Sequence, residues 1–252
     1  MIRVVRTSVT PVKGATLHHP EEIEIEPYGV PGDRRFLFID PNGTTYHSGR
    51  LGPLAGVRAD VEGDTLTFTL ADHTSVCAPA LADDDAFEFD IWGRALLVRP
   101  VPGPWDEAIS RVVGLPLRLV ETVDPGAGSD GDPITLVSLA SVAALASEAG
   151  VDEVDPGRFR MTLDIDGVQA LEEESWAGRR ISMGSVVLRV GEQVPRCLVT
   201  TWEPGSGVRD FDTLKFIANY RGRTPDGLPF GMYASVVEPG VVRCGDGIRL
   251  LD

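Results

Sequence analysis

The chain has 252 residues and a formal net charge of −15 at pH 7, and all but two of its 23 basic residues are arginine. A chain of this length buries enough apolar surface to fold without metals or disulfides. A surface this acidic repels phosphate backbones, which argues against nucleic acid as a partner. A few arginines can still converge on one small anion, because net charge does not describe a single pocket.

Cysteine usage and the chain start indicate the compartment. Cys77, Cys197 and Cys244 stand far apart, and an odd number leaves at least one unpaired, which is typical of a reducing environment. The sequence has no CxxC spacing and no HExxH pattern, so it does not indicate a metal site made of protein ligands alone. Neither a signal-peptide core nor a membrane-length apolar run is present. We expect a soluble cytoplasmic protein that does not bind membranes.

Short apolar segments closed by Gly, Pro, Asn or Asp dominate the first half. Residues 34–40 predict a strand ending at the turn signal PNGT, with the stretch 44–48 following it. Residues 57–70 predict two strands joined at Gly63 and Asp64. The acidic stretch 82–90 predicts a solvated loop that leads into a strand. Together these segments are typical of a barrel or sandwich.

Helical signals are fewer. Residues 104–114 carry acids in the first turn and end in glycine, 138–150 are rich in alanine and stop at Gly150, and 210–222 place apolar residues on one face. The closing segment, 232–251, predicts two strands joined by a turn at Pro239 and Gly240. The expected fold class is therefore mainly β with a few helices (α+β).

Residues 123–133 (VDPGAGSDGDP) are the clearest linker candidate, and they predict domains at 1–124 and 133–252. This segment contains a formal GxGxxG pattern. A dinucleotide loop needs a helix that starts at its last glycine. Here Asp130, Asp132 and Pro133 add negative charge and break a helix start, so we reject a nucleotide site.

Cys197 allows two interpretations on local sequence alone. The run CLVTT is strand-like, and free cysteine is often buried in a core. Alternatively, the neighbouring Arg196 favours the thiolate, and the turn that follows leaves room for a ligand. Cations beside turns also stand out in so acidic a chain and could form an anion pocket, although each alone is typical of a surface charge. They are Lys13, Arg34, Arg35, Arg158 and Arg160.

The order of several motifs carries a family resemblance. TPVKG followed by YGVPGDRRFLFID resembles the N-terminal β-barrel domain that accompanies MOSC domains. GRFRMTLDID, GSVVLRVGEQVPRCLVTTWEPGSG and FGMYASVVEPGVVRCGDGIRLL resemble the MOSC domain, named for the carboxyl terminus of molybdenum cofactor sulfurase. The resemblance implies a MOSC-type β-barrel plus an N-terminal β-barrel-like domain. Members of this family include the mitochondrial amidoxime-reducing component and bacterial reductases of N-hydroxylated compounds.

The resemblance also implies site residues and a molybdenum cofactor (Mo-molybdopterin). Cys197 matches the family's metal-ligating cysteine, so it would be both metal ligand and catalytic residue, and a soft thiolate suits a metal held by pterin sulfurs. Lys13, Arg34 and Arg160 would bind the cofactor. Thr200 and Thr201 would supply hydroxyl hydrogen bonds near the metal, and Ser138 would contact the pterin or phosphate.

Two departures from the family pattern concern the substrate. Met161 and Thr162 stand where relatives commonly have Pro-Asn, so an expected pterin contact is replaced or lost. Trp202 and Glu203 stand where relatives have Val-Asp. Trp202 would line a pocket for a bulky substrate or pack in its turn, and a metal-bound water or Glu203 would donate a proton.

The function implied is two-electron reduction of N-hydroxylated or related N-oxygenated small molecules by oxo transfer to molybdenum. A separate electron-donor protein, such as a reductase, ferredoxin or cytochrome-like carrier, would supply the electrons. Two alternatives remain. One is a pathway-specific molybdoenzyme with a different substrate, and the other is a cofactor-binding module or sulfur relay in which Cys197 carries a persulfide.

Overall fold

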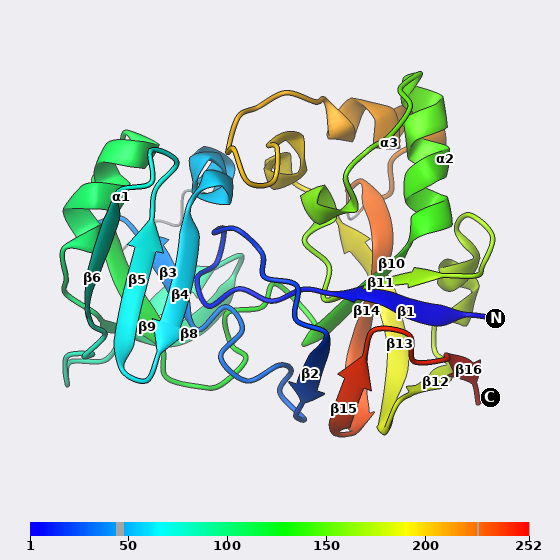
Figure 1. Cartoon of the computed structure of the whole chain (residues 1–252), viewed down its shortest axis with the longest axis horizontal. Coiled ribbons are helices and arrows are strands. Elements are labelled where there is room, and N and C mark those ends of the chain that lie inside the picture. Colours follow the sequence, from blue (N-terminus) through cyan, green and yellow to red (C-terminus); the bar gives the residue numbers. More distant parts are fainter. Residues whose placement is uncertain (44–47, 226, 252) are drawn as a thin grey trace.

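The computed structural model describes residues 1–43, 48–225 and 227–251, and it is mainly β with a few helices, as the sequence predicts. Figure 1 shows two lobes side by side, one built around β4, β5 and α1 and the other around a larger sheet flanked by α2 and α3. The stretch 44–48, which follows the predicted strand at residues 34–40, lies almost wholly outside the described residues. No helix in the described ranges is long and apolar enough to cross a membrane.

The larger sheet dominates the second lobe. Its described strands run in the order β1 (Arg3–Thr7), β11 (Leu163–Asp166), β10 (Ile134–Ser138), β14 (Pro229–Glu238), β13 (Val186–Pro195), β12 (Arg180–Met183) and β16 (Arg249–Leu250). All described neighbours are antiparallel except β10 and β11, which are parallel. Register shifts between β13 and β14 bend this pair, as bulges do.

The first lobe contains two smaller sheets. One has the order β3 (Phe36–Ile39), β9 (Arg118–Thr122), β8 (Arg94–Pro100) and β7 (Phe87–Ile91), and the other has β4 (Arg58–Glu62), β5 (Thr65–Thr69) and β6 (Ser75–Pro79). The predicted hairpin at residues 57–70 is confirmed as β4 and β5. The acidic loop also leads into a strand, β7, as expected.

The three predicted helices are confirmed among the described residues as α1 (Trp105–Val113), α2 (Leu139–Ala149) and α3 (Thr213–Arg221). The Ser138 hydroxyl caps α2, and Gly150 ends it with a φ of 69°. A side-chain acceptor before the first turn and a left-handed glycine after the last satisfy free backbone groups. Short 3-10 helices complete the fold: η1 (Ser48–Arg50), η2 (Gly52–Gly56), η3 (Pro156–Phe159), η4 (Glu172–Trp176) and η5 (Leu198–Thr201).

The N-terminal segment belongs to both lobes. Strand β1 pairs with β11, and β2 (Glu22–Ile25) pairs with β15 (Gly240–Arg243), so early residues join the second lobe. Val4, Ile23 and Ile25 are buried in the core of that lobe, whereas Val12 and Phe36 are buried in the first. The two lobes are thus tied together by the chain start, visible in blue in Figure 1. The division at 1–124 and 133–252 stays a prediction.

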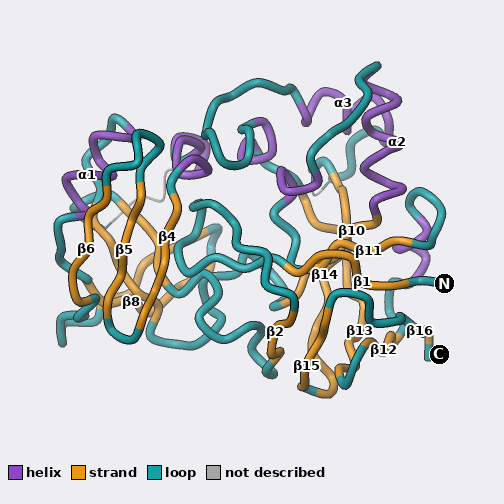
Figure 2. The backbone as a smooth tube through the Cα atoms, viewed as in Figure 1, coloured by secondary structure: helices purple, strands orange, loops and turns teal. Residues whose placement is uncertain are grey.

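One expectation needs correction. The run after Cys197 is not a strand, because residues 198–201 form η5. The closing segment forms two strands, β14 and β15, on either side of Pro239, as expected, and β15 pairs with β2. Figure 2 shows the extended loops that pass between the two lobes.

Candidate functional site

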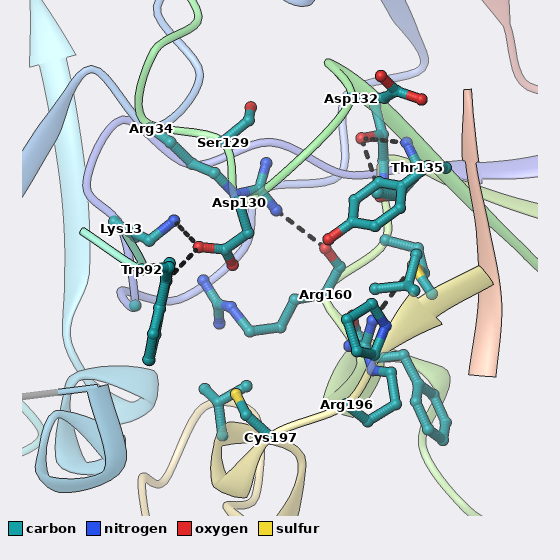
Figure 3. A pocket seen from close by; sticks show the side chains of 18 of the residues that line it. Lys13, Arg34, Trp92, Ser129, Asp130, Asp132, Thr135, Arg160, Arg196 and Cys197 are labelled. Carbon is teal, nitrogen blue, oxygen red and sulfur yellow. Dashed lines mark hydrogen bonds and ion pairs between the residues drawn. The ribbon is translucent and has the colours of Figure 1, made fainter. Parts of the chain in front are cut away.

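A cavity of about 490 Å³ lies where segments from both lobes meet. Lys13, Arg34, Leu51 and Trp92 line it from the first half of the chain, and the segments 159–162 and 194–197 line it from the second, with residues 129–133 between them. Figure 3 shows these side chains converging. Among the described lining residues the cations are Lys13, Arg34, Arg160 and Arg196, and the acids are Asp130 and Asp132.

Lys13 is almost fully buried, with 6% of its surface exposed. Its backbone N–H donates to Phe36 O at 2.8 Å, which fixes the loop against β3. The ammonium donates to Gly128 O at 2.6 Å and pairs with the Asp130 carboxylate at 2.7 Å. Burial lowers the pKa of Lys13, and the attraction of Asp130 opposes that effect.

Arg34 and Arg160 both adopt left-handed backbone conformations, with φ of 51° and 54°. Such conformations turn the chain sharply, so each side chain leaves a tight bend. The Arg34 guanidinium pairs with Asp33 and donates to Arg160 O at 2.9 Å. The Arg160 guanidinium donates to Ala15 O at 2.7 Å. The two arginines therefore stitch together the loops that form the cavity wall.

Cys197 is an exposed free cysteine that lines the cavity, so the interpretation as a core residue is wrong. Its backbone is extended, with φ of −119° and ψ of −178°, and it immediately precedes η5. This position places the thiol at the end of β13, where the chain turns. The thiol is thus available to a ligand in the cavity.

Arg196, the neighbour of Cys197, is held in place by Phe159. Its guanidinium donates to Phe159 O and lies 5.7 Å from the centre of that ring. Its Nε is buried and has no hydrogen-bond partner in the described part of the chain. Burial lowers the pKa of Arg196, and the nearby Cys197 acts in the opposite direction. A buried donor without a partner is a place where an anionic ligand would gain a hydrogen bond.

Three predicted residues do not line the cavity. Ser138 is buried at the start of α2, where its hydroxyl contacts that of Ser141 at 2.7 Å. Thr200 and Thr201 are buried within η5, and their hydroxyls donate to Cys197 O and Leu198 O at 3.1 and 2.7 Å. The two threonine hydroxyls stabilise the backbone of the Cys197 loop, which runs from Cys197 through η5 to Trp202.

The residues that depart from the family pattern separate into two groups. Met161 and Thr162 line the cavity, but Trp202 and Glu203 do not. A Cβ placed on Gly52 would lie 1.9 Å from the Trp202 ring, so this tryptophan packs directly on the backbone of η2. The packing interpretation of Trp202 is therefore the correct one. Its contact clamps the Cys197 loop to the first lobe.

The remaining candidate cations point elsewhere. Arg158 forms a two-contact pair with Asp210 at 2.6 and 2.8 Å, and the exposed Arg35 pairs with Glu121 at 2.7 Å. Neither lines the cavity. Both arginines form structural ion pairs, which is the usual role of a single arginine beside a turn.

The sequence missed part of the site because residues 123–133 predict a linker. Instead, this segment forms a wall of the cavity. A Cβ on Gly128 would lie 1.9 Å from Arg34 O, so the absence of a side chain permits this close approach. The residues that follow enter β10 rather than a helix, in agreement with the rejection of a nucleotide site. Trp92 was missed as well, because no local signal marks it as a cavity residue.

Comparison with known proteins identifies the family. The MOSC domain matches residues 124–249, and the MOSC N-terminal beta barrel domain matches residues 1–98. The chain therefore belongs to the MOSC domain family, as its motifs indicate.

The chain is similar to several named proteins. It is 33% identical over 138 residues to mitochondrial amidoxime-reducing component 1 of Mus musculus, covering 52% of this chain and 40% of that protein. It is 25% identical over 268 residues to molybdenum cofactor sulfurase 2 of Culex quinquefasciatus, covering 88% of this chain and 33% of that protein. The match thus spans less than half the length of these relatives. Among solved structures, the YUAD protein from Bacillus subtilis aligns over 98% of this chain and 94% of its own, with 13% identity and a TM-score of 0.47.

Proposed function

We propose that this chain is a molybdenum-cofactor-dependent oxidoreductase that reduces N-hydroxylated or related N-oxygenated compounds. The observation that supports it best is an exposed Cys197 thiol at a cavity whose cations outnumber its acids. The names of the relatives, which include amidoxime-reducing components and a molybdenum cofactor sulfurase, point to the same chemistry.

The residues present fit a large anionic cofactor that carries a soft metal. Lys13, Arg34 and Arg160 would hold the phosphate and the polar pterin edge, because guanidinium and ammonium groups bind such oxygens. The buried Nε of Arg196 has no hydrogen-bond partner among the described residues. It would donate a hydrogen bond to an oxygen of the same cofactor. The Cys197 sulfur would ligate the metal, since thiolate is a soft donor. The two threonines of η5 would hold the loop that presents this sulfur.

When bound, the cofactor would supply the two-electron chemistry of the reaction. For an amidoxime the balanced change is cleavage of the N–O bond with uptake of two electrons and two protons, which releases an amidine and water. Tyr233 lines the cavity, and burial together with the charge of Asp130 raises its pKa. Its Oη therefore keeps its proton near neutral pH and would donate a hydrogen bond to the substrate oxygen.

The electrons must come from a donor. We propose a separate one-electron carrier protein, of the flavin, iron–sulfur or haem class, that reduces the cofactor in two successive steps. Turnover with a reduced viologen in place of the carrier separates the reaction itself from the identity of the donor.

The decisive experiment combines metal analysis with a cysteine replacement. Protein purified from a host that makes the cofactor is expected to contain molybdenum near one atom per chain and to reduce benzamidoxime with reduced viologen. Cys197→Ser removes the soft ligand from an exposed position and should abolish turnover without loss of folding. Cys77→Ser changes another exposed free cysteine, on β6, and serves as the matched control. Full turnover by Cys197→Ser would contradict the ligand assignment.

A sulfur relay is the second candidate, favoured by the exposure of Cys197 and by the similarity to molybdenum cofactor sulfurase 2 over 88% of the chain. In this reaction Cys197 would take a sulfane sulfur from a donor persulfide and pass it to an acceptor nucleophile, with no net redox change. Metal-free protein that carries cyanide-releasable sulfur, lost in Cys197→Ser, would favour the relay over the reductase.

A further inference from the structure

Trp92 occupies a position that the fold alone does not explain. It forms a two-residue turn with Gly93 between β7 and β8, and both residues have positive φ, 59° and 76°. Such turns favour Asn, Asp or Gly at the first position, and a bulky residue there is an outlier. Trp92 is also 60% exposed, whereas Trp105 and Trp176 are buried. The residue therefore serves neither the turn nor a core.

The indole is nevertheless held in a defined place. Its Nε1–H donates to Asp130 Oδ1 at 3.2 Å, and that carboxylate pairs with the Lys13 ammonium at 2.7 Å. Lys13 is in turn buried and bonded to Gly128 O. Figure 3 shows Asp130 between the other two residues and joined to both. A chain of polar contacts thus anchors an exposed aromatic ring at the wall of the cavity.

Apolar side chains form part of the cavity wall. Val199 is half-buried and lines the same cavity as Trp92 and Cys197, and the nearly fully buried Leu51 and Phe159 lie behind its surface. An aromatic ring exposed next to apolar surface is a stacking platform for another planar ring. Polar groups that fix its orientation reduce the entropy lost on binding.

We propose that Trp92 is a substrate-binding residue that selects planar aromatic N-oxygenated compounds over aliphatic ones. This inference rests on the proposed function, since it assigns the substrate class of the same cavity. The aromatic part of the substrate stacks on the indole, and the N–O group then extends toward Cys197. Trp92 acts on binding and takes no part in bond cleavage.

The test compares two amidoximes that differ only in their hydrocarbon part. For the cofactor-loaded enzyme we expect Trp92→Asn to lower the kcat/KM of benzamidoxime relative to acetamidoxime by roughly three- to tenfold, the range for loss of one aromatic pair. The loss should lie mainly in KM for benzamidoxime. Trp92→Phe keeps a ring and should retain most of the preference.

A matched control is His73→Asn. His73 also has a positive φ, 66°, in the turn between β5 and β6, and it does not line the cavity. Asparagine suits both turns, so both variants should fold. His73→Asn should leave the substrate ratio unchanged. A ratio unchanged within about twofold in Trp92→Asn, or an equal fall in both variants, would overturn the proposal.

Failure of the proposed function gives a different result. If cofactor-loaded wild-type protein reduces neither amidoxime, the reductase assignment fails, and calorimetric binding of benzamidoxime to the same protein decides the inference. A Kd that is weaker by roughly three- to tenfold in Trp92→Asn supports the platform. Absence of binding, or an equal Kd in both proteins, overturns it.

Discussion

The Lys13 ammonium lies 2.7 Å from the Asp130 carboxylate, although Lys13 is near the start of the chain and Asp130 lies just past its middle. Burial would raise the pKa of Asp130, but Lys13 and Arg34 outweigh it, so the pKa is lowered and the acid stays charged. The cavity therefore carries its own counter-ion for its most buried cation. Any anionic ligand at Lys13 has to compete with this acid.

Asp130→Asn tests that competition. The neutral amide keeps an acceptor for Trp92 but leaves the buried ammonium without its charge partner. Because the Asp130 side chain is 55% exposed, we expect a modest loss of about 1 to 2 kcal/mol in the free energy of unfolding. Inorganic phosphate should then raise the melting temperature of the variant more than that of the wild type, since a ligand that binds the native state stabilises it.

The control for this prediction is Glu107→Gln, which removes the same charge from an exposed pair with Arg111 on α1. Phosphate should affect this variant as it affects the wild type. If phosphate raised the melting temperature of all three proteins equally, Asp130 would not compete with anions for Lys13.

The contact between Gly52 and Trp202 makes a prediction about the Cys197 loop. In Gly52→Ala the new Cβ would lie 1.9 Å from the indole, so Trp202 must move. We expect a loss of about 1 to 3 kcal/mol in the free energy of unfolding, the usual range for overpacking. We also expect a changed rate of alkylation at Cys197, measured by mass spectrometry, because Trp202 ends the turn that begins there.

Gly247→Ala is the matched control, because the nearest atom to its added Cβ lies 4.0 Å away. This variant should keep wild-type stability and wild-type thiol reactivity. If Gly52→Ala matched it in both measurements, the clamp between Trp202 and η2 would not constrain the loop.

Elements with local signals were predictable from the sequence, and pairings between distant segments were not. Helix α2 follows from a serine cap and a glycine stop, and the hairpin at Gly63 follows from its alternating flanks. The pairing of β2 with β15 has no local signal, because register between distant strands is set by burial of their shared face. For the same reason, the sequence did not predict that β1 belongs to the sheet of the second lobe.

The candidate site divides in the same way. Lys13, Arg34, Arg160 and Cys197 were selected by turn context and family motifs, and the structure brings them to one cavity. Asp130 was missed because Gly, Pro and Asp together are typical of a linker, although here the glycines permit close backbone packing. Trp92 was missed because no local signal in the sequence marks it as a cavity residue.

Burial of Asp106 predicts a pH-dependent stability. Burial raises the pKa of this carboxyl from 3.8 to about 6, although the N–H of Leu119 donates to it. Because the folded state favours the protonated acid, this contribution is fully present below about 3.8 and is lost as the pH rises through about 6. The free energy of unfolding of Asp106→Asn minus that of wild type should therefore be larger at high pH than at low pH.

The size of this effect is about 1 to 2 kcal/mol, after allowance for the part of the side chain that water reaches. It is measured as the difference in free energy of unfolding between variant and wild type at pH 4 and pH 7.5. Glu107→Gln, in the same helical turn, controls for removal of negative charge from the start of α1. A difference that does not change with pH would contradict the raised pKa.

Trp92→Asn should stabilise the protein while it weakens aromatic substrate binding. A bulky residue in the left-handed region costs about 1 to 2 kcal/mol, and asparagine is favoured there. The variant gives up one exposed hydrogen bond to Asp130, worth about 0.5 to 1 kcal/mol. We therefore expect a net gain of up to about 1.5 kcal/mol in the free energy of unfolding, measured by urea titration.

Trp92→Phe supplies the comparison, because phenylalanine keeps the backbone penalty and loses the hydrogen bond, and it should be slightly less stable than wild type. A gain in stability that accompanies a loss in aromatic preference is the behaviour of a residue retained for binding at the expense of the fold. If Trp92→Asn were instead the less stable protein, the indole would be a structural element of the hairpin, and its exposure at the cavity would have no bearing on the substrate.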